Sequence, residues 1–132
     1  MEFAVETADR LTTVGITEHV REALERRDTP VNNGIATVFV EHTTAALLVQ
    51  EDEPRLRGDL ESFISGLVPD EGHAHDELDG NADSHLRASI FGPSVTVPLV
   101  DGELALGRWQ SIFLLECDGP RTRRVSVRVV GN

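Results

Sequence analysis

Apolar residues in the middle of the chain recur at helical spacing. Between residues 54 and 69 they fall three or four positions apart, which places them on one face of a helix. They are Leu56, Leu60, Phe63, Ile64 and Leu67. Pro54 suits the first position of this helix, where no backbone N–H is needed, and Pro69 ends it.

Two shorter helices are predicted on either side of this one. The first covers residues 18–27, with Thr17 as its N-cap. The second ends near Ile90 and begins at an N-cap that either Asn81 or Asp83 supplies. The segment before it, residues 69–81, holds two histidines and five carboxylates. A loop of this length is usually functional or disordered.

Both ends of the chain carry strand patterns. The predicted strands span residues 3–8, 35–40, 94–100, 104–106, 109–117 and 123–130. Apolar and polar residues alternate in the segments 94–100 and 123–130, and Asp101-Gly102 is a hairpin turn signal. Residues 45–49 form a further apolar run that is either a strand or a short helix, because periodicity does not separate the two.

Strands on both sides of a helical middle predict an α/β fold of the α+β type. We expect a mixed β-sheet with the helices packed on one face. The chain shows no internal repeat, low-complexity tract or linker, so residues 1–132 are expected to form one compact domain.

Composition indicates the cellular compartment of the protein. No apolar run approaches the ~18 residues that span a bilayer, and the N-terminus lacks the basic and apolar regions of a secretory signal. Cys117 is the only cysteine, which excludes an intrachain disulfide and thiolate zinc clusters. These features favour a cytoplasmic protein without a membrane partner.

The charge balance is strongly acidic. The formal net charge is −11, and all 12 basic residues are arginines. Non-specific nucleic-acid binding needs a basic face that displaces counterions, so this balance argues against a nucleic-acid partner. An acidic, lysine-free surface indicates adaptation to a high-salt, halophilic cytoplasm, where ions screen self-repulsion. A GC-rich genome, which favours Arg over Lys, is the alternative.

Three histidines are the main candidates for chemistry. His42 directly follows the apolar run 35–40, His75 lies in the acidic loop, and His85 is in the first turn of the last helix. Three imidazoles with an open fourth position make a catalytic type of zinc site. Their spacings, 33 and 10 residues, match no compact zinc motif. From spacing alone, ordinary surface or capping histidines are the favoured interpretation.

Other candidates lie in the last third of the chain. Glu116 precedes a Gly-Pro turn and three arginines, of which Arg121 is the first. Such groups commonly form surface salt bridges, but guanidinium groups also bind phosphate and carboxylate with two hydrogen bonds. Trp109 and Gln110 serve either packing or a pocket wall. No phosphate-binding loop, dinucleotide fingerprint or nucleophile elbow occurs.

Several short motifs follow one another along the chain in an order that is specific to one protein family. They are His42-Thr43-Thr44-Ala45 with Glu51, then Asn81-Ala82-Asp83-Ser84-His85-Leu86, then Leu106-Gly107-Arg108-Trp109-Gln110, and finally Glu116-Cys117-Asp118-Gly119-Pro120-Arg121. In this order they resemble the YjbQ family, an uncharacterised family often labelled secondary thiamine-phosphate synthase. The resemblance runs nearly end to end. His73 departs from it, because an aromatic residue often stands there, and so does Cys117, where the family often has an apolar residue.

The resemblance implies a homotrimer with a pocket near the subunit contact. It implies that His42, His75 and His85 gather there around a divalent metal, zinc or, if the synthase label is right, magnesium. With Arg121 these histidines would be the catalytic residues. The residues that would line or support the pocket are Asn81, Trp109, Gln110 and Glu116.

Three functions stay open on this basis. One is a low-level thiamine-phosphate synthase, in which arginines hold the diphosphate of the substrate. Another is a metal-dependent hydrolase or lyase of a small phosphorylated metabolite. The last is a trimer that binds a metal or ligand without catalysis.

Overall fold

The computed structural model describes residues 1–132 as strands in two sheets, with three α-helices and one 3-10 turn. The strands are β1 (Glu2–Glu6), β2 (Thr12–Gly15), β3 (Gly34–Val40), β4 (Ala45–Glu51), β5 (Ser94–Val100), β6 (Glu103–Leu104), β7 (Gln110–Glu116) and β8 (Thr122–Gly131). The helices are α1 (Thr17–Glu25), α2 (Pro54–Leu67) and α3 (Ala82–Phe91), and the 3-10 turn is η1 (Ala74–Glu77).

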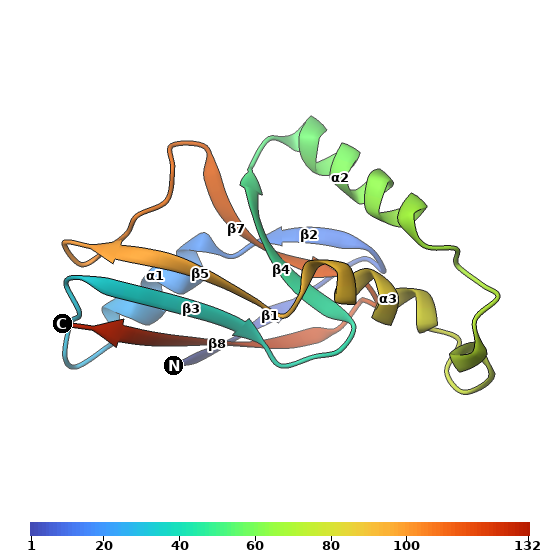
Figure 1. Cartoon of the computed structure of the whole chain (residues 1–132), viewed down its shortest axis with the longest axis horizontal. Helices are drawn as coiled ribbons and strands as arrows, with labels where there is room; N and C mark the ends of the chain where they lie inside the picture. The colour runs from blue at the N-terminus through green and yellow to red at the C-terminus, as the bar shows by residue number, and fades with distance from the viewer.

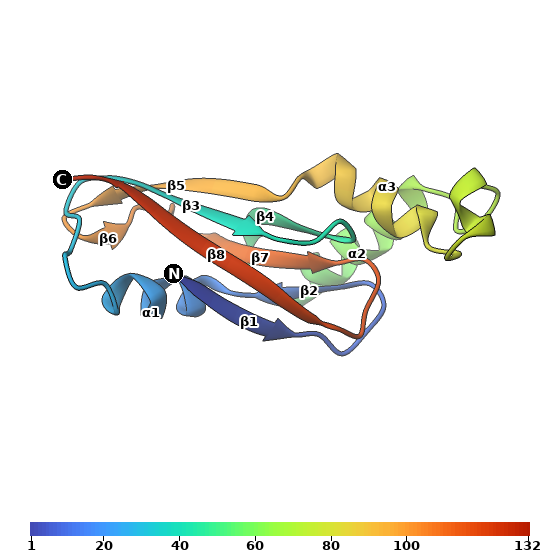
Figure 2. The ribbon, with the colours of Figure 1, turned by 90° about the horizontal axis from the view of Figure 1, so that it is seen from below.

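The strands divide between two sheets, and every strand pair is antiparallel (Figure 1). The outer sheet has the order β1-β8-β3-β5-β6, and the inner sheet has the order β2-β7-β4. Strand β8 is the longest and pairs with both β1 and β3, so that Val125 lies opposite Phe3 on one side and Val40 on the other. Figure 2 shows this long strand running diagonally across the molecule.

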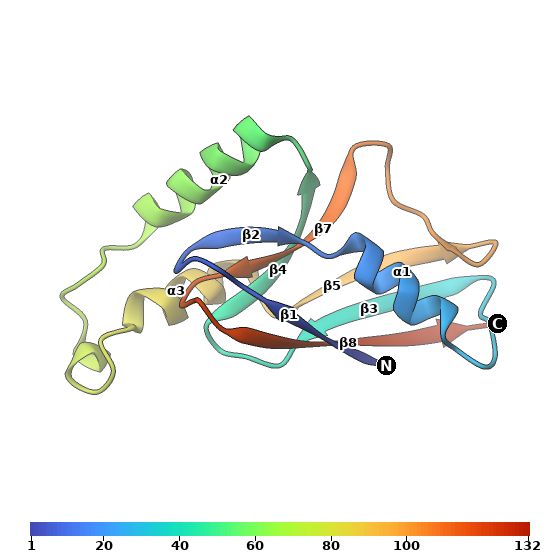
Figure 3. The same cartoon turned by 180° about the vertical axis from the view of Figure 1, so that it is seen from behind.

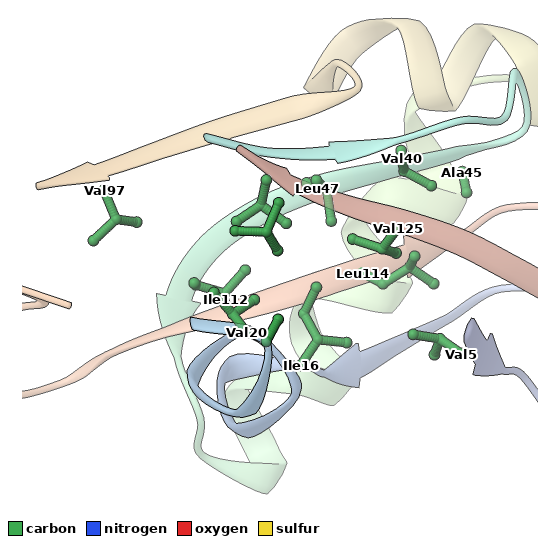
Figure 4. Close-up of a cluster of buried hydrophobic side chains, with 13 residues drawn as sticks. Val5, Ile16, Val20, Val40, Ala45, Leu47, Val97, Ile112, Leu114 and Val125 are labelled. Carbon is green, nitrogen blue, oxygen red and sulfur yellow. The ribbon is translucent and has the colours of Figure 1, made fainter. Parts of the chain in front are cut away.

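The main core lies between the outer sheet, the inner sheet and α1 (Figure 4). Strand β3 alternates regularly, with Ala36, Val38 and Val40 buried and Ile35 and Phe39 on the outward face. Helix α1 contributes the buried residues of its apolar stripe and contacts β1, β7 and β8 (Figure 3). Burial of these aliphatic side chains is the main stabilising force of the fold.

A second, smaller core lies on the other face of the inner sheet. Ile64 of α2 and Ala88 of α3 pack there against Leu115 and Cys117. Strand β7 is therefore covered on both faces, and residues 112–117 are all buried. A continuous apolar run is typical of such a strand, whereas the strands of the half-exposed outer sheet alternate.

These observations confirm the α+β class. The run 45–49 is a strand, and it lies at the edge of the inner sheet. Thr17 does not cap α1: the N-cap is Ile16, and the Thr17 hydroxyl instead accepts the N–H of Ile112 at 2.9 Å. Asn81 is the N-cap residue of α3, but its side chain makes no capping hydrogen bond. None of the helices combines the length and the apolar character that crossing a membrane requires.

Candidate functional site

His42 lies two residues beyond the end of β3, where the β3–β8 ladder finishes. The last regular pair of that ladder is Val40 with Val125, and the N–H of Glu41 still donates to the carbonyl of Arg124 at 3.2 Å. The N–H of Arg124 then donates to Nε2 of His42 at 2.9 Å. The imidazole thus replaces a backbone carbonyl and gives the ladder one more acceptor. This bond requires a neutral ring with its proton on Nδ1.

Partial burial lowers the pKa of His42, and the nearby Arg123 guanidinium lowers it further. Both effects favour the neutral ring, because burial and a neighbouring positive charge each disfavour a second cation. The lowered pKa and the hydrogen bond donated by the Arg124 N–H therefore both favour the neutral ring of His42.

A cavity of about 960 Å³ opens beside His42. Its lining comes from the end of β3, the β3–β4 loop, one face of α3 and the turn into β5. The lining residues are Phe39, Val40, Glu41, His42, Thr43, Ala45, His85, Ala88, Ser89, Gly92 and Pro93. His42 and His85 thus reach one cavity from distant parts of the chain.

His75 lies on the other side of His85. The two rings meet edge to face, with centroids 5.0 Å apart and planes at 89°. Nε2 of His75 is buried and has no hydrogen-bond partner, and it lies 3.7 Å from Oδ2 of Asp79. The structure therefore brings His75 to His85, and His85 to the cavity that His42 lines.

The three histidines do not fit a shared metal ion within one chain. No group of three or more His, Cys, Asp or Glu side chains is arranged to hold a metal. In addition, Nε2 of His42 is occupied by the N–H of Arg124. The trio predicted as the metal-ligand set therefore separates into a neighbouring pair, His75 and His85, and a histidine that closes a strand ladder.

Glu116 is fully buried and is not among the residues that line the cavity. Its carboxylate accepts hydrogen bonds from Nε of Arg123 at 2.8 Å, the hydroxyl of Thr7 at 2.7 Å and the N–H of Asp118 at 2.9 Å. Burial opposes its ionisation, but these hydrogen bonds hold the pKa of Glu116 below its usual value. With its oxygens occupied, Glu116 supports the surrounding strands and does not line the pocket.

Arg121 and Asn81 share one carboxylate near the start of α3. Both donate to Oδ2 of Asp118, from Nη2 of Arg121 at 2.9 Å and from Nδ2 of Asn81 at 3.0 Å. Burial opposes ionisation of Asp118, but these donors lower its pKa. The amide oxygen of Asn81 is buried and has no partner. Nε of Arg121 also donates to the carbonyl of Asp118 at 2.8 Å, so Nη1 of this half-exposed side chain is the guanidinium nitrogen left open to an anion.

Trp109 and Gln110 lie at the far end of the inner sheet. Gln110 pairs with Glu51, whereas Glu116 pairs with Ala45 at the other end of the same two strands. Six residue steps along a strand span about 20 Å. The side chain of Trp109 is exposed and lies against the guanidinium of Arg108, 4.8 Å from the ring centroid. Within one chain these two residues do not meet the histidines.

Sequence reasoning missed the role of Arg87. This arginine is fully buried and pairs with Asp83, which also receives two hydrogen bonds from Arg10. Arg87 further donates to the carbonyls of Ile64, Ser65 and Val68 at the end of α2. The only sequence signal was the four-residue spacing of Asp83 and Arg87 on one helix, which does not reveal burial.

Comparisons with known proteins agree with this architecture. The family model described as "UPF0047 protein YjbQ-like" matches residues 1–132. A UPF0047 protein of Archaeoglobus fulgidus is 47% identical over 131 residues, which cover 98% of this chain and all of that protein. One from Methanothermobacter thermautotrophicus is 46% identical over 98% of this chain and 90% of its own length.

Solved structures show the same fold. The crystal structure of a hypothetical protein from Aeropyrum pernix K1 has a TM-score of 0.94 and 41% identity, covering all of this chain and 98% of that one. A protein of unknown function from Sulfolobus solfataricus P2, described as YbjQ-like, has a TM-score of 0.94 and 36% identity, covering all of this chain and 96% of that one. By sequence and by fold, the chain belongs to the YjbQ-like UPF0047 protein family.

Proposed function

We propose that this protein binds a small phosphorylated metabolite in the cavity between His42 and His85. The convergence of these two histidines, from the end of β3 and from α3, on one cavity of about 960 Å³ carries the proposal. This volume is in the range of sites for small molecules, roughly 300–1,000 Å³. The lining combines apolar walls with a few polar groups, which is typical of such sites.

Arginines at the start of β8 support an anionic ligand. Arg123 and Arg121 lower the pKa of His42 through their charge, whereas Glu116 and Glu41 raise it, so charges of both signs act on this wall of the cavity. Arg123 is buried in its pair with Glu116, but Arg121 is half exposed. A guanidinium group binds phosphate with two parallel hydrogen bonds. The phosphate of the ligand is expected on this side of the cavity.

The reaction that we propose first is formation of thiamine phosphate. A hydroxymethylpyrimidine diphosphate would lose pyrophosphate as the ring nitrogen of a thiazole phosphate forms the new bond to its methylene carbon. Arg121 would stabilise the charge that develops on the leaving pyrophosphate. Unlike His42, His85 accepts no backbone hydrogen bond on its ring, and it would position the substrate beside the cavity wall.

Binding without catalysis is the second candidate function. It is favoured by the structural roles of two expected site residues, because His42 closes a strand ladder and Glu116 is occupied by Arg123. A protein whose site residues mainly support the fold can still bind a metabolite and release it unchanged. Release of inorganic phosphate from the ligand would instead identify a hydrolase.

We also propose that the protein assembles as a homotrimer through the outer face of the outer sheet. That face is unpartnered and carries the exposed residues Ile35, Phe39, Val100 and Val130. Exposed apolar patches of this kind commonly mark protein interfaces. Phe39 belongs both to this face and to the cavity lining, so a second copy docked there would border the ligand.

An enzymatic assay tests the ligand and the reaction together. The two thiamine precursors are supplied to wild-type protein, His85→Ala and the control His19→Ala, whose ring stacks on Phe3 away from the cavity. We expect product with wild type and His19→Ala and a large loss with His85→Ala. Equal product from all three would assign the activity to a contaminant. Thermal-shift binding of the precursors without product would support the binding function.

Light scattering on a sizing column tests the assembly. A trimer of the 14.5 kDa chain has a mass of about 43 kDa. Ile35→Asp places a charge on the outer face and is expected to dissociate it, whereas Ile90→Asp on α3 is the matched control for an exposed isoleucine. A wild-type mass of one chain would overturn the proposed trimer.

A further inference from the structure

We propose that the protein binds a free α-amino acid with an aliphatic side chain in a second cavity, at the end of the molecule opposite His42. This cavity has a volume of about 550 Å³ and lies between α1, the loop that follows it, and the β5–β6 hairpin. Figure 2 shows α1 on one side of this end of the molecule and β5 and β6 on the other. The volume is within the range of small-molecule sites, roughly 300–1,000 Å³.

The second cavity is separate from the one that His42 lines. It lies at the beginning of β3, where Gly34 pairs with Leu99, whereas His42 follows Val40 at the other end of that strand. Six residue steps along a strand span about 20 Å. The two cavities share no lining residue. An amino acid bound here is therefore independent of the phosphorylated metabolite proposed above.

The floor of the second cavity is aliphatic. It is formed by side chains from α1, the following loop and three strands: Leu24, Val31, Leu99, Leu104 and Val129. Leu24, Leu104 and Val129 also pack against the main core, so the floor is continuous with that core. A hydrocarbon group placed on this floor gains free energy by leaving water. No aromatic side chain lines the cavity, so a flat ring would find no stacking partner there.

Four charged side chains form the rim of this cavity. They are Arg21, Glu25, Arg27 and Glu103. Two are positive and two are negative, so the rim is formally neutral on a chain whose net charge is −11. A simple anion would meet the two carboxylates, and a simple amine would meet the two guanidinium groups. An amino acid carries a carboxylate and an ammonium group on one carbon, and it complements both signs at once.

Contacts within the protein leave these charged groups available. Arg21 pairs through Nη1 with Glu18, one turn before it, and not with Glu25, one turn after it. Arg27 donates only from Nε, to a backbone carbonyl of the following loop at 3.3 Å. Glu25 and Glu103 take part in none of the ion pairs of the chain. Each guanidinium group therefore keeps nitrogens that can bind the carboxylate of a ligand.

The end of α1 orients the ligand. The helix ends at Glu25, and the carbonyl groups at a helix C-terminus carry partial negative charge. This partial charge adds to the carboxylate charges of Glu25 and Glu103, so the ammonium group is expected beside these two side chains. The carboxylate of the ligand is expected beside Arg27, which is only partly exposed. The aliphatic side chain then lies on the floor.

Backbone hydrogen bonds hold the wall of the second cavity in place. The loop after α1 is tied to the β5–β6 turn, because the N–H of Gly102 donates to the carbonyl of Asn32 at 2.8 Å. The loop is also tied to the end of the chain, because the N–H groups of Asn32 and Asn33 donate to the carbonyl of Asn132 at 2.9 and 3.0 Å. A cavity formed in advance costs less to fill, since less of the chain has to be ordered on binding.

Titration with three matched ligands, followed by nuclear magnetic resonance of the backbone amides, tests the proposal. L-Leucine carries both charged groups, 4-methylpentanoate lacks the amine, and 3-methylbutylamine lacks the carboxylate. We expect leucine to bind at one site per chain and to shift amides of residues 21–31, 99–104 and 129. The other two ligands should bind about tenfold more weakly or less, because each leaves one pair of charged rim groups without its partner.

Variants of the rim check the location. Arg27→Gln and Glu103→Gln should each weaken leucine binding about tenfold, because each removes one charged partner of the ligand. Arg26→Gln and Glu22→Gln remove the same kinds of charge from exposed residues that do not line the cavity, and they should bind leucine as wild type does.

Three outcomes would overturn the proposal. They are absence of leucine binding at millimolar concentration, equal affinity for all three ligands, and a loss in Arg26→Gln as large as in Arg27→Gln. Amide shifts confined to the surroundings of His42 and His85 would likewise place leucine in the other cavity and contradict the assignment. None of these measurements involves a phosphorylated metabolite, so failure of the thiamine-phosphate assay does not affect them.

Discussion

Arg123 and Glu116 form a buried ion pair that ties the two sheets together. Arg123 lies on β8 of the outer sheet and Glu116 on β7 of the inner sheet, and both side chains are almost fully shielded from solvent. Arg123 also donates to the hydroxyl of Thr44 at 2.9 Å, just before β4 begins. Each group of the pair therefore depends on the other, because neither has access to water.

The first prediction concerns this pair. Arg123→Met should lower the free energy of unfolding by about 3–5 kcal/mol, because it leaves the buried Glu116 carboxylate without its cation. Urea denaturation followed by circular dichroism measures the loss. Arg121→Met removes a half-exposed pair with Asp118 from the same strand region and should cost only about 1 kcal/mol or less. Equal losses in the two variants would show that burial of the first pair carries no special cost.

The second prediction concerns stability in acid. Burial opposes ionisation of Asp83, but hydrogen bonds from Arg10 and Arg87 hold its pKa below the ordinary value of 3.8. Hydrogen bonds to Glu116 similarly hold its pKa below 4.5. A lowered pKa means that the unfolded state binds protons first, so these groups stabilise the fold above their ordinary values. Their contribution is lost as the pH falls below about 4.5 and through the lower folded pKa values.

Urea midpoints between pH 7 and pH 3 measure this dependence. Asp83→Asn should be less stable at pH 7 and should lose less stability on acidification, because the neutral amide does not titrate. Asp59→Asn removes an exposed carboxylate from α2 and should leave the acid dependence unchanged. A urea midpoint of the wild-type protein that stays constant from pH 5 to pH 3 would contradict the assignment.

Local patterns were enough to predict several elements of the fold. The helix that begins at Pro54 is found, and the side chain of Glu53 caps it by accepting the N–H of Leu56 at 2.6 Å. The Asp101-Gly102 turn joins β5 to β6 with both residues at positive φ, 51° and 82°. These features depend on neighbours in sequence, so short-range rules describe them well.

Long-range pairing could not be read in the same way. The periodicity of β7 does not reveal that it lies in a different sheet from β8, which follows it in the chain. The burial of Arg87 depends on carbonyls of α2, more than 15 residues away along the chain. For the site, the resemblance implied that His42, His75 and His85 gather around a metal, and the structure shows His42 and His85 lining one cavity. The resemblance did not predict that the backbone N–H of Arg124 donates a hydrogen bond to Nε2 of His42.

The third prediction follows from that hydrogen bond. His42→Ala removes the acceptor of the Arg124 N–H and should lower the free energy of unfolding by about 1–2 kcal/mol. His42→Gln supplies a side-chain oxygen at similar reach and should recover part of the loss. Hydrogen exchange of the Arg124 amide measures the local effect, which should be fast in the alanine variant and slower in the glutamine variant. Unchanged protection of this amide in His42→Ala would contradict a role in closing the ladder.

The fourth prediction concerns the end of α2. Arg87 donates to the carbonyls of Ile64, Ser65 and Val68, which have no partners within the helix end. Arg87→Met should therefore loosen the last turn of α2 and speed hydrogen exchange and proteolysis in residues 65–72. Arg55→Met, which alters an almost fully exposed arginine at the start of the same helix, is the control. Equal proteolysis rates in wild type and Arg87→Met would show that the carbonyls are satisfied without this side chain.

The last prediction concerns salt. With a formal net charge of −11 and no lysine, the chain repels itself at low ionic strength, and added salt shortens the range of that repulsion from about 30 Å at 0.01 M to about 3 Å at 1 M. Calorimetry should therefore show a melting temperature that rises steadily with sodium chloride. A double variant, Glu22→Gln with Glu25→Gln, removes two exposed charges from α1 and should need less salt to reach the same melting temperature. Full stability without added salt, in both proteins, would leave a GC-rich genome as the explanation of the arginine-only composition.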